Sequence, residues 1–183
     1  MALITKSDIE NKIGRTLNTE ESNSFAVVNA GLQAYVEKII GSSIEVANTA
    51  GRYYDGGVQH LSIDPATDIT EVALVNEDNS IVEVLNSVDY TLEPVNATLK
   101  TMVRHRSKFA TGINNIKVTG KFSIYGDSKV LAIVKDSLIN AIVSELTNNS
   151  NIKRESIEGY SVEYISNEAK TALSPIKYIF AGV

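Results

Sequence analysis

The spacing of the apolar residues changes twice along this chain, and this change constrains the fold more than any single motif. Apolar residues recur every three or four positions from Phe25 to Ile40 and again from Val130 to Leu146. Between these segments, from about 43 to 126, the repeat is two, and turn residues separate short apolar runs. A repeat near 3.6 is typical of amphipathic helices, and a repeat of two is typical of strands. The sequence therefore predicts an α+β fold, a small helical bundle with a large antiparallel β insertion.

Capping signals set the bounds of the predicted helices. A Ser or Thr followed three positions later by an acid forms a capping box, and a glycine often ends a helix. These patterns predict a short helix from Ser7 to Gly14, a long one from Thr19 to Gly41, a second long one opened by Asp127 or Ser128, and a short C-terminal one opened by Ser174-Pro175. We expect helices at about 7–40 and 128–181, within a single domain that spans 1–183.

The insertion is expected to contain short strands joined by tight turns. Asp55-Gly56-Gly57 and Glu77-Asp78-Asn79-Ser80 are predicted hairpin turns, because Asn, Asp and Gly tolerate the positive φ values that such turns need. The second hairpin, Ile69–Val75 returning through Ile81–Leu85, has the strongest local pattern. The predicted strands lie near Ile44–Thr49, Arg52–Tyr54, Val58–Ile63, Thr70–Val75, Ile81–Leu85, Tyr90–Leu92, Leu99–Arg104 and Asn115–Tyr125.

The segment Glu155–Tyr164, between two predicted helices, has the composition of an assembly element and not of a catalytic one. Its sequence is Glu-Ser-Ile-Glu-Gly-Tyr-Ser-Val-Glu-Tyr. A turn at Gly159 followed by alternating apolar and aromatic residues predicts a short exposed strand. Such a strand can pair with another chain. The residues expected to make this contact are Ile157, Gly159, Tyr160, Val162 and Tyr164.

The chain has a net charge of −5, and in its middle part the acidic and basic residues are separated into two consecutive blocks. From Tyr53 to Leu99 there are acids and no Lys or Arg, and from Lys100 to Lys121 there are bases and no acid. Opposite potentials can fix the register between neighbouring copies in a ring. The alternative is that the two blocks pair within one subunit.

Several kinds of chemistry lack the residues they need. The chain has no cysteine, which excludes disulfides, thiolate metal sites and a cysteine nucleophile. It has only two histidines, too few for a histidine-rich metal site. The carboxylates are scattered, without the spacing that acid-base catalysis requires. No apolar run approaches the length of about 18 residues that crosses a bilayer. We therefore expect no enzyme, no cofactor and no membrane contact, in a protein made in a cytoplasm.

A basic stretch predicts an electrostatic contact. Lys100, Arg104, Arg106 and Lys108 lie at alternate positions along and after a predicted strand, so their side chains could meet phosphates or an acidic partner. Phe109 is the only aromatic residue from Lys100 to Lys121, so the base stacking of a single-strand binder is not expected. A non-specific contact with passing DNA remains the hypothesis.

Several short motifs occur in a definite order along nearly the whole chain. A short and a long helix come first, and the predicted helix from Ser128 and the Glu155–Tyr164 segment come last. Between them stand Gly51-Arg52-Tyr53-Tyr54, Asp89-Tyr90-Thr91-Leu92-Glu93-Pro94 and Ile116-Lys117-Val118-Thr119-Gly120. In this order the chain resembles the head-tail connector (adaptor, or head-completion) proteins of long-tailed bacteriophages. The sequence departs from many members in its acid-rich β insertion and in the weakly basic helix from Ser128.

The resemblance implies a structural virion protein at the capsid–tail junction, assembled in the host cytoplasm. Copies would form a ring, usually dodecameric, beneath the portal protein, and DNA would pass through its channel. The Glu155–Tyr164 segment would contact a neighbouring subunit or the next neck, stopper or tail protein. The C-terminal residues implied to dock against the portal are Ser174, Pro175, Ile176, Tyr178, Ile179 and Phe180.

Two alternatives follow from the same sequence. The first is a tail terminator or other neck ring, which a hexameric assembly and a dominant β-sheet scaffold would distinguish. The second is a small β-rich module that binds carbohydrate or DNA. That class needs an exposed aromatic platform, and the chain contains no Trp.

Overall fold

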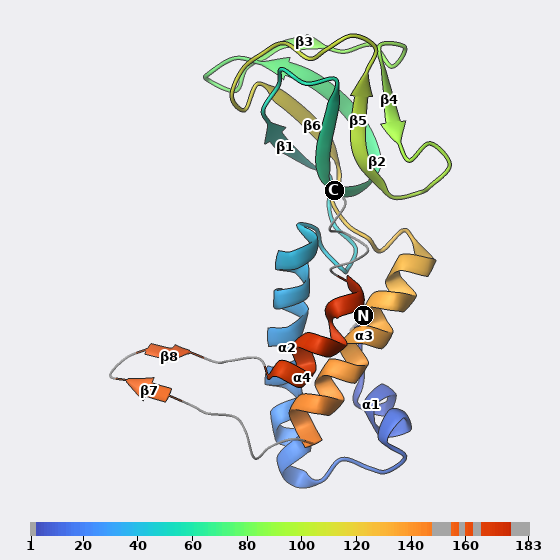
Figure 1. The fold of residues 1–183 in the computed structure, drawn as a ribbon, viewed down its shortest axis with the longest axis vertical. Coiled ribbons are helices and arrows are strands. Elements are labelled where there is room, and N and C mark those ends of the chain that lie inside the picture. Colours follow the sequence, from blue (N-terminus) through green and yellow to red (C-terminus); the bar gives the residue numbers. More distant parts are fainter. Residues whose placement is uncertain (1–2, 148–154, 158–159, 163–165, 177–183) are drawn as a thin grey trace. The chain divides into compact units, whose positions relative to one another are not determined.

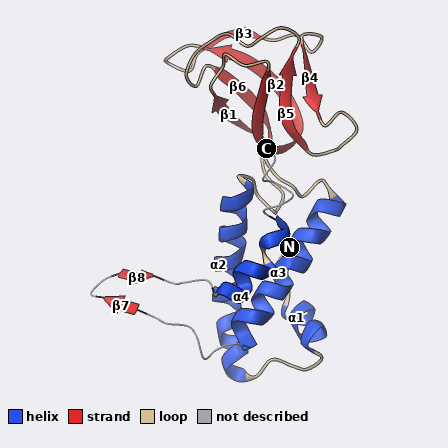
Figure 2. Ribbon diagram, viewed as in Figure 1, coloured by secondary structure: helices blue, strands red, loops and turns tan. Residues whose placement is uncertain are grey.

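The computed structural model describes residues 3–147, 155–157, 160–162 and 166–176, and confirms the α+β class (Figures 1 and 2). The described part of the chain divides into two compact units. One contains 1–39 and 129–182 and is helical, and the other contains 40–128 and is built from strands. The division falls at the points where the apolar repeat changes. That the two units make up a single domain stays a prediction.

The helical unit contains α1 (Lys6–Ile13), nearly all of α2 (Thr19–Ile40) and α3 (Ser128–Thr147), and α4 (Asn167–Ala172). Charged groups join α1 to α3, since the Lys135 ammonium lies 3.1 Å from Asp8 and that of Lys12 lies 3.6 Å from Asp136. The apolar faces supply the core residues Ile9, Phe25, Leu32, Val36, Val134, Leu138, Ile142, Ala169 and Leu173. The helical repeat in the sequence therefore marks the faces that are buried.

The first helix begins two residues earlier than the sequence predicted. Its N-cap is Thr5, whose hydroxyl accepts a hydrogen bond from the Asp8 backbone N–H at 3.3 Å. The Asp8 carboxylate accepts in return from the Thr5 N–H at 2.8 Å. Thr5 and Asp8 have the same spacing as the predicted pair Ser7 and Glu10, so the pattern fits two overlapping boxes. The predicted stop at Gly14 is confirmed, with φ at 72°.

A buried acid, Glu21, stabilises the N-terminus of α2. The Glu21 carboxylate is bound by the Arg15 guanidinium at 2.6 and 2.7 Å and by the Asn18 N–H at 2.8 Å. Asn18 reciprocates, because its side-chain oxygen accepts from the Glu21 N–H at 2.9 Å. The hydrogen bond from Arg15, then that from Asn18, lowers the pKa of Glu21 to about 2.

We expect this contact to add an acid-sensitive term to stability. The folded pKa of about 2 lies below the ordinary value of 4.5, so the stabilisation is complete above pH 4.5 and is lost as the pH falls toward 2. Glu21→Gln should be less stable than the wild type at neutral pH, and the difference should shrink across that window. Thermal melts from pH 7 to 2 measure it, with the exposed acid Glu20 as the control substitution. A difference that did not change with pH would contradict the prediction.

The β unit is a six-stranded antiparallel sheet in which one long strand is shared by two groups. β2 (His60–Val75) pairs through its first half with β5 (Lys100–His105) and through its second half with β3 (Ile81–Val84) and β6 (Ile116–Lys121). β1 (Ala50–Tyr54) lies beside β6, and β4 (Tyr90–Glu93) lies beside β5, so the order is β1-β6-β2-β5-β4. The core of this sheet includes Leu61, Ile63, Val72, Val103, Phe109, Ile116, Val118 and Phe122.

One strand prediction was wrong, and two others turned out to be parts of a single strand. The predicted strands Val58–Ile63 and Thr70–Val75 are one strand, β2, in which Asp68 has a φ of 49° and the register with β5 and β6 shifts. Ile44–Thr49 forms no strand, and only the bridge from Ser43 to Ser123 lies beside it.

The turn Asp55-Gly56-Gly57 does not close a hairpin, because β1 and β2 lie on opposite sides of β6. By contrast, the β2–β3 hairpin is confirmed. Asn79 takes a φ of 64° in its turn, as the Glu77–Ser80 pattern predicted.

The last part of the chain also differs from the prediction. The Glu155–Tyr164 segment contains two antiparallel strands, β7 (Glu155–Ile157) and β8 (Tyr160–Val162), where one was predicted. A helix that was not predicted, α4, begins at Asn167, where the Ser166 side chain caps it by accepting a hydrogen bond from the Ala169 N–H at 3.1 Å. The buried Glu145 holds this cap, since its carboxylate accepts from the Ser166 N–H at 2.7 Å. The helix predicted to open at Ser174-Pro175 is helical at 174–176, and its remaining residues lie outside the described part of the chain.

Candidate interaction surfaces

The predicted basic stretch begins on a strand inside the sheet and ends on an exposed loop. Lys100 and Arg104 belong to β5, whereas Arg106 and Lys108 belong to the loop that follows. Arg104 Nε lies 3.0 Å from the Glu93 carboxylate on β4, and Lys100 Nζ donates to the Pro94 and Val95 carbonyls at 2.8 and 3.0 Å. These two cations are therefore satisfied within the subunit.

Arg106 and Lys108 are the exposed remainder of that stretch. Backbone hydrogen bonds hold this loop in place. The Arg106 N–H donates to the Asp89 carbonyl oxygen at 2.8 Å, and the Phe109 N–H donates to the Val58 carbonyl oxygen at 2.9 Å. Among the described residues, no ion pair involves the side chain of Arg106 or Lys108. The alternating spacing in the sequence predicted one surface of four cations, and the structure leaves two of the four available.

The two charge blocks meet within the β unit. Arg104 from the basic block pairs with Glu93 from the acidic block, and Lys121 pairs with Asp68 at 2.9 Å. Antiparallel pairing of β5 with β4 and of β6 with β2 places these residues on adjoining strands. The sequence left open whether the two blocks pair within one subunit. These two ion pairs show that some of their residues do. Acids of the β2–β3 hairpin, Glu77 and Glu83, are exposed and lie outside these pairs.

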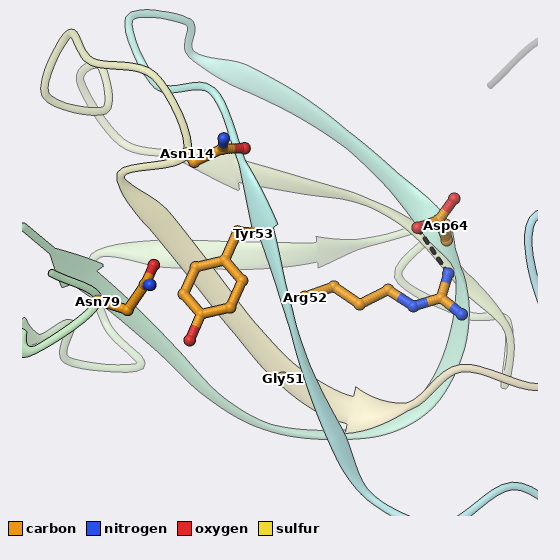
Figure 3. A pocket seen from close by; sticks show the side chains of 6 residues that line it. All are labelled: Gly51, Arg52, Tyr53, Asp64, Asn79 and Asn114. Atoms are coloured by element: carbon orange, nitrogen blue, oxygen red, sulfur yellow. Dashed lines mark ion pairs between the residues drawn. The ribbon is translucent and has the colours of Figure 1, made fainter. Parts of the chain in front are cut away.

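A polar hollow lies beside β1, lined by Gly51, Arg52, Tyr53, Asp64, Asn79 and Asn114 (Figure 3). Arg52 and Tyr53 are consecutive on β1 and point in different directions, Arg52 toward Asp64 and Tyr53 toward Asn79. The Arg52 guanidinium lies 2.6 Å from the Asp64 carboxylate. It also lies 4.3 Å from the centre of the Phe122 ring and donates to the Gly41 carbonyl at 2.5 Å.

This arrangement lies within the β unit, and it holds the backbone at Gly41, the residue that directly follows α2. The Tyr54 hydroxyl donates to Asp64 at 3.1 Å, and burial, followed by the charge of Asp64, raises the pKa of Tyr54. A side chain at Gly41 would place its Cβ 2.6 Å from the Asp64 carboxylate, and Gly41 has a φ of 76°. The Arg52–Asp64 pair, with Tyr54 and the Gly41 carbonyl, therefore has a structural role in the β unit.

We expect a measurable coupling between Arg52 and Asp64. In a double-mutant cycle with Arg52→Met and Asp64→Asn, the coupling free energy should be about 1 kcal/mol, because each side chain is only about one third exposed. The matched control is Lys121→Met with Asp68→Asn, a pair in the same sheet whose side chains are 43% and 65% exposed. That pair should give roughly 0.5 kcal/mol or less. Urea denaturation measures both cycles, and equal couplings would contradict the structural role.

The residues predicted to dock against a portal lie partly in the core. Ile176 is completely buried, so it contributes to the helical unit, whereas Ser174 and Pro175 lie in the short helical stretch that leads to it. Tyr178, Ile179 and Phe180 lie outside the described residues, as do Gly159 and Tyr164 of the predicted subunit contact. Ile157 belongs to β7, and Tyr160 and Val162 belong to β8. The docking and contact roles of these residues stay predictions.

One exposed surface was not singled out from the sequence. β3 lies at an edge of the sheet, paired with β2 only, and all four of its residues are exposed. Ile81, Val82 and Val84 are 46%, 66% and 55% exposed. The sequence did contain a pattern that could have pointed to this surface, the apolar strand Ile-Val-Glu-Val directly after a turn. Its exposure could not be predicted, because it depends on what covers the sheet.

The fold is shared with a protein of a phage-like particle. A chain in a structure described as the neck of an empty GTA particle computed with C6 symmetry superposes with a TM-score of 0.53 at 7% identity. The match covers 95% of this chain and 88% of that one. A GTA is a phage-like gene transfer agent. No family model matches the sequence, and no curated protein matches it.

The described helices include none that is long and apolar enough to cross a membrane. In the described ranges, no three His, Cys, Asp or Glu side chains are placed to share a metal ion.

Proposed function

We propose that this chain is a structural protein of the head-to-tail neck of a phage-like particle, where its copies form a ring. The observation that carries the proposal is the fold, a helical unit with a β insertion, which matches a chain of a GTA neck over 95% of this sequence. The order of the sequence motifs supports the same assignment independently of the structure. The proposal includes no enzymatic activity and no cofactor.

The more specific proposal is a connector, or adaptor, beneath the portal protein. In it, the C-terminal segment from Ser174 docks against the portal, and the β7–β8 hairpin contacts a neighbouring subunit or the next protein toward the tail. A dodecameric ring is compatible with the C6 symmetry of the similar structure, because a twelvefold axis contains a sixfold one. A hexameric tail terminator is compatible with the same symmetry and is the second candidate.

Cryo-electron microscopy of particles containing this chain tests both candidates, provided that the capsid vertex is reconstructed without an imposed symmetry number. Twelve copies directly beneath the portal would support the connector. Six copies farther from the capsid would favour the terminator. Absence of the chain from the neck would contradict both and favour a small binding module.

The exposed cations of the loop after β5 offer a test of the DNA contact. We expect Arg106→Glu with Lys108→Glu to reduce retention of packaged DNA by about tenfold, because reversed charges repel phosphates. Arg104→Gln is the control, since Arg104 is already paired with Glu93 and should alter retention little. Nuclease protection of DNA in purified particles measures the effect. Unchanged retention in the double variant would assign this loop to the solvated surface.

A further inference from the structure

His105, the last residue of β5, accepts a hydrogen bond that its ring can accept only while it is neutral. Its Nδ1 accepts from the Ser107 backbone N–H at 3.2 Å, and the Ser107 hydroxyl lies at the same distance from that nitrogen. An imidazole nitrogen accepts only when it carries no proton, so the proton of the neutral ring lies on Nε2. This hydrogen bond closes the first bend of the loop that follows β5.

Further contacts hold the imidazole against the loop. The ring centroids of His105 and Phe109 lie 4.9 Å apart, and Phe109 belongs to the buried core of the β unit. The His105 N–H donates to the Gln59 carbonyl oxygen at 2.9 Å, and Tyr90 lies opposite His105 on β4. A change at Nδ1 therefore acts on a backbone that is fixed on both sides of the bend.

The charges near His105 are mostly positive. The charged and titratable groups that adjoin it are Arg104, Arg106 and Lys108 along its own segment, His60 opposite Arg104 on β2, and Asp89 and Tyr90 at the start of β4. Arg104 is paired with Glu93. Burial, followed by the charge of Glu71, raises the pKa of Tyr90, so Tyr90 stays neutral. Between about pH 5 and pH 8 the side chains that ordinarily change charge are histidines, here His105 and His60.

We propose that His105 is a pH-sensitive latch for the loop after β5, closed while the imidazole is neutral and open when it is protonated. A proton on Nδ1 turns this acceptor into a donor, which then faces the Ser107 N–H instead of accepting from it. The bend that carries Arg106 must rearrange, and the Ser107 N–H turns to water. The latch is a property of the chain itself. Its effect on phosphate contacts rests on the proposed function, in which the exposed cations of this loop contact DNA.

Nuclear magnetic resonance of the full chain tests the latch. At about pH 8 the imidazole nitrogen shifts should place the proton of His105 on Nε2. As the pH falls to about 5, protection of the Ser107 amide from solvent exchange, relative to the intrinsic rate at each pH, should fall about fivefold, the effect of one lost hydrogen bond. A proton on Nδ1 at the higher pH, or unchanged protection while His105 titrates, would overturn the proposal.

Three variants connect the response to the hydrogen bond. His105→Asn places an amide oxygen near the position of Nδ1, and this oxygen accepts at every pH, so the Ser107 amide should stay protected throughout. His105→Ala should lose the protection at both ends of the range. The matched control is His60→Asn, since His60 is exposed on β2 and should leave the response at Ser107 unchanged. A response that persists in His105→Asn, or vanishes in His60→Asn, would overturn the latch.

The spectra require no particle, so the latch stands or fails separately from the neck assignment. In purified particles, nuclease protection of packaged DNA should change between about pH 8 and pH 5 in the wild type and not in His105→Asn. If the spectra show the latch and DNA protection does not change with pH, the effect on the phosphate contact is overturned and the latch stands. If the chain is absent from necks, the proposed function fails, and the spectra still decide the latch.

Discussion

Replacing Gly56 by alanine is expected to lower the free energy of unfolding of the β unit by about 3 kcal/mol, a large effect for one methyl group. The added Cβ would lie 2.0 Å from the Ala110 carbonyl oxygen and 2.7 Å from the Asn115 side-chain oxygen. The Gly56 N–H donates to that same Asn115 oxygen and to the Gly112 carbonyl, each at 2.9 Å. The loop between β5 and β6 cannot make room without losing these bonds.

Gly31 is the matched control for this substitution. It lies within α2, and a Cβ built there meets nothing within 4 Å. Gly31→Ala should raise stability by up to about 1 kcal/mol, because alanine is the better helix former. Urea denaturation followed by far-ultraviolet circular dichroism measures both variants. A loss of less than about 1 kcal/mol in Gly56→Ala would mean that the loop is not held in this close approach.

Leu138→Ala is expected to cost about 2–5 kcal/mol in the helical unit. Leu138 is completely buried on α3, so the substitution removes apolar contacts and leaves a cavity. Ile133→Ala on the same helix is the control, since Ile133 is 43% exposed and should cost about 0.5 kcal/mol or less. Thermal and urea unfolding measure the pair. Similar costs in both would contradict the packing of this face.

Local patterns account for the elements that were predicted correctly. Gly14 ends α1 and Asn79 turns the β2–β3 hairpin, because positive φ values are a property of the residue and its immediate neighbours. The two long helices follow from their apolar repeat, which reports the face that must be buried. These features involve residues close in the sequence, so the sequence alone is sufficient to predict them.

The errors in the sheet concern contacts between distant residues. Asp55-Gly56-Gly57 has the composition of a hairpin turn, but β1, which ends directly before it, pairs with β6 and not with β2, and Tyr54 lies opposite Ile116. Gly56 is required there for the close approach of the Ala110 carbonyl, and not for a turn between neighbouring strands. The composition of a turn does not reveal which strands will lie side by side.

The same distinction between local and long-range features applies to the candidate surfaces. The sequence identified the basic stretch and the Glu155–Tyr164 segment, but not that Arg104 is paired with Glu93, that Ile176 is buried, or that β3 is an exposed edge. Each of these depends on neighbours brought together by folding.

The sequence by itself determined the α+β class, the two long helices, the β2–β3 hairpin and the absence of cysteine chemistry, because periodicity, capping and composition act locally. Only the tertiary structure decided the strand order β1-β6-β2-β5-β4, and therefore which charges are neutralised within the subunit and which apolar residues remain exposed. The physical reason is that burial and ion pairing depend on distances between residues far apart in the chain, such as Lys121 and Asp68.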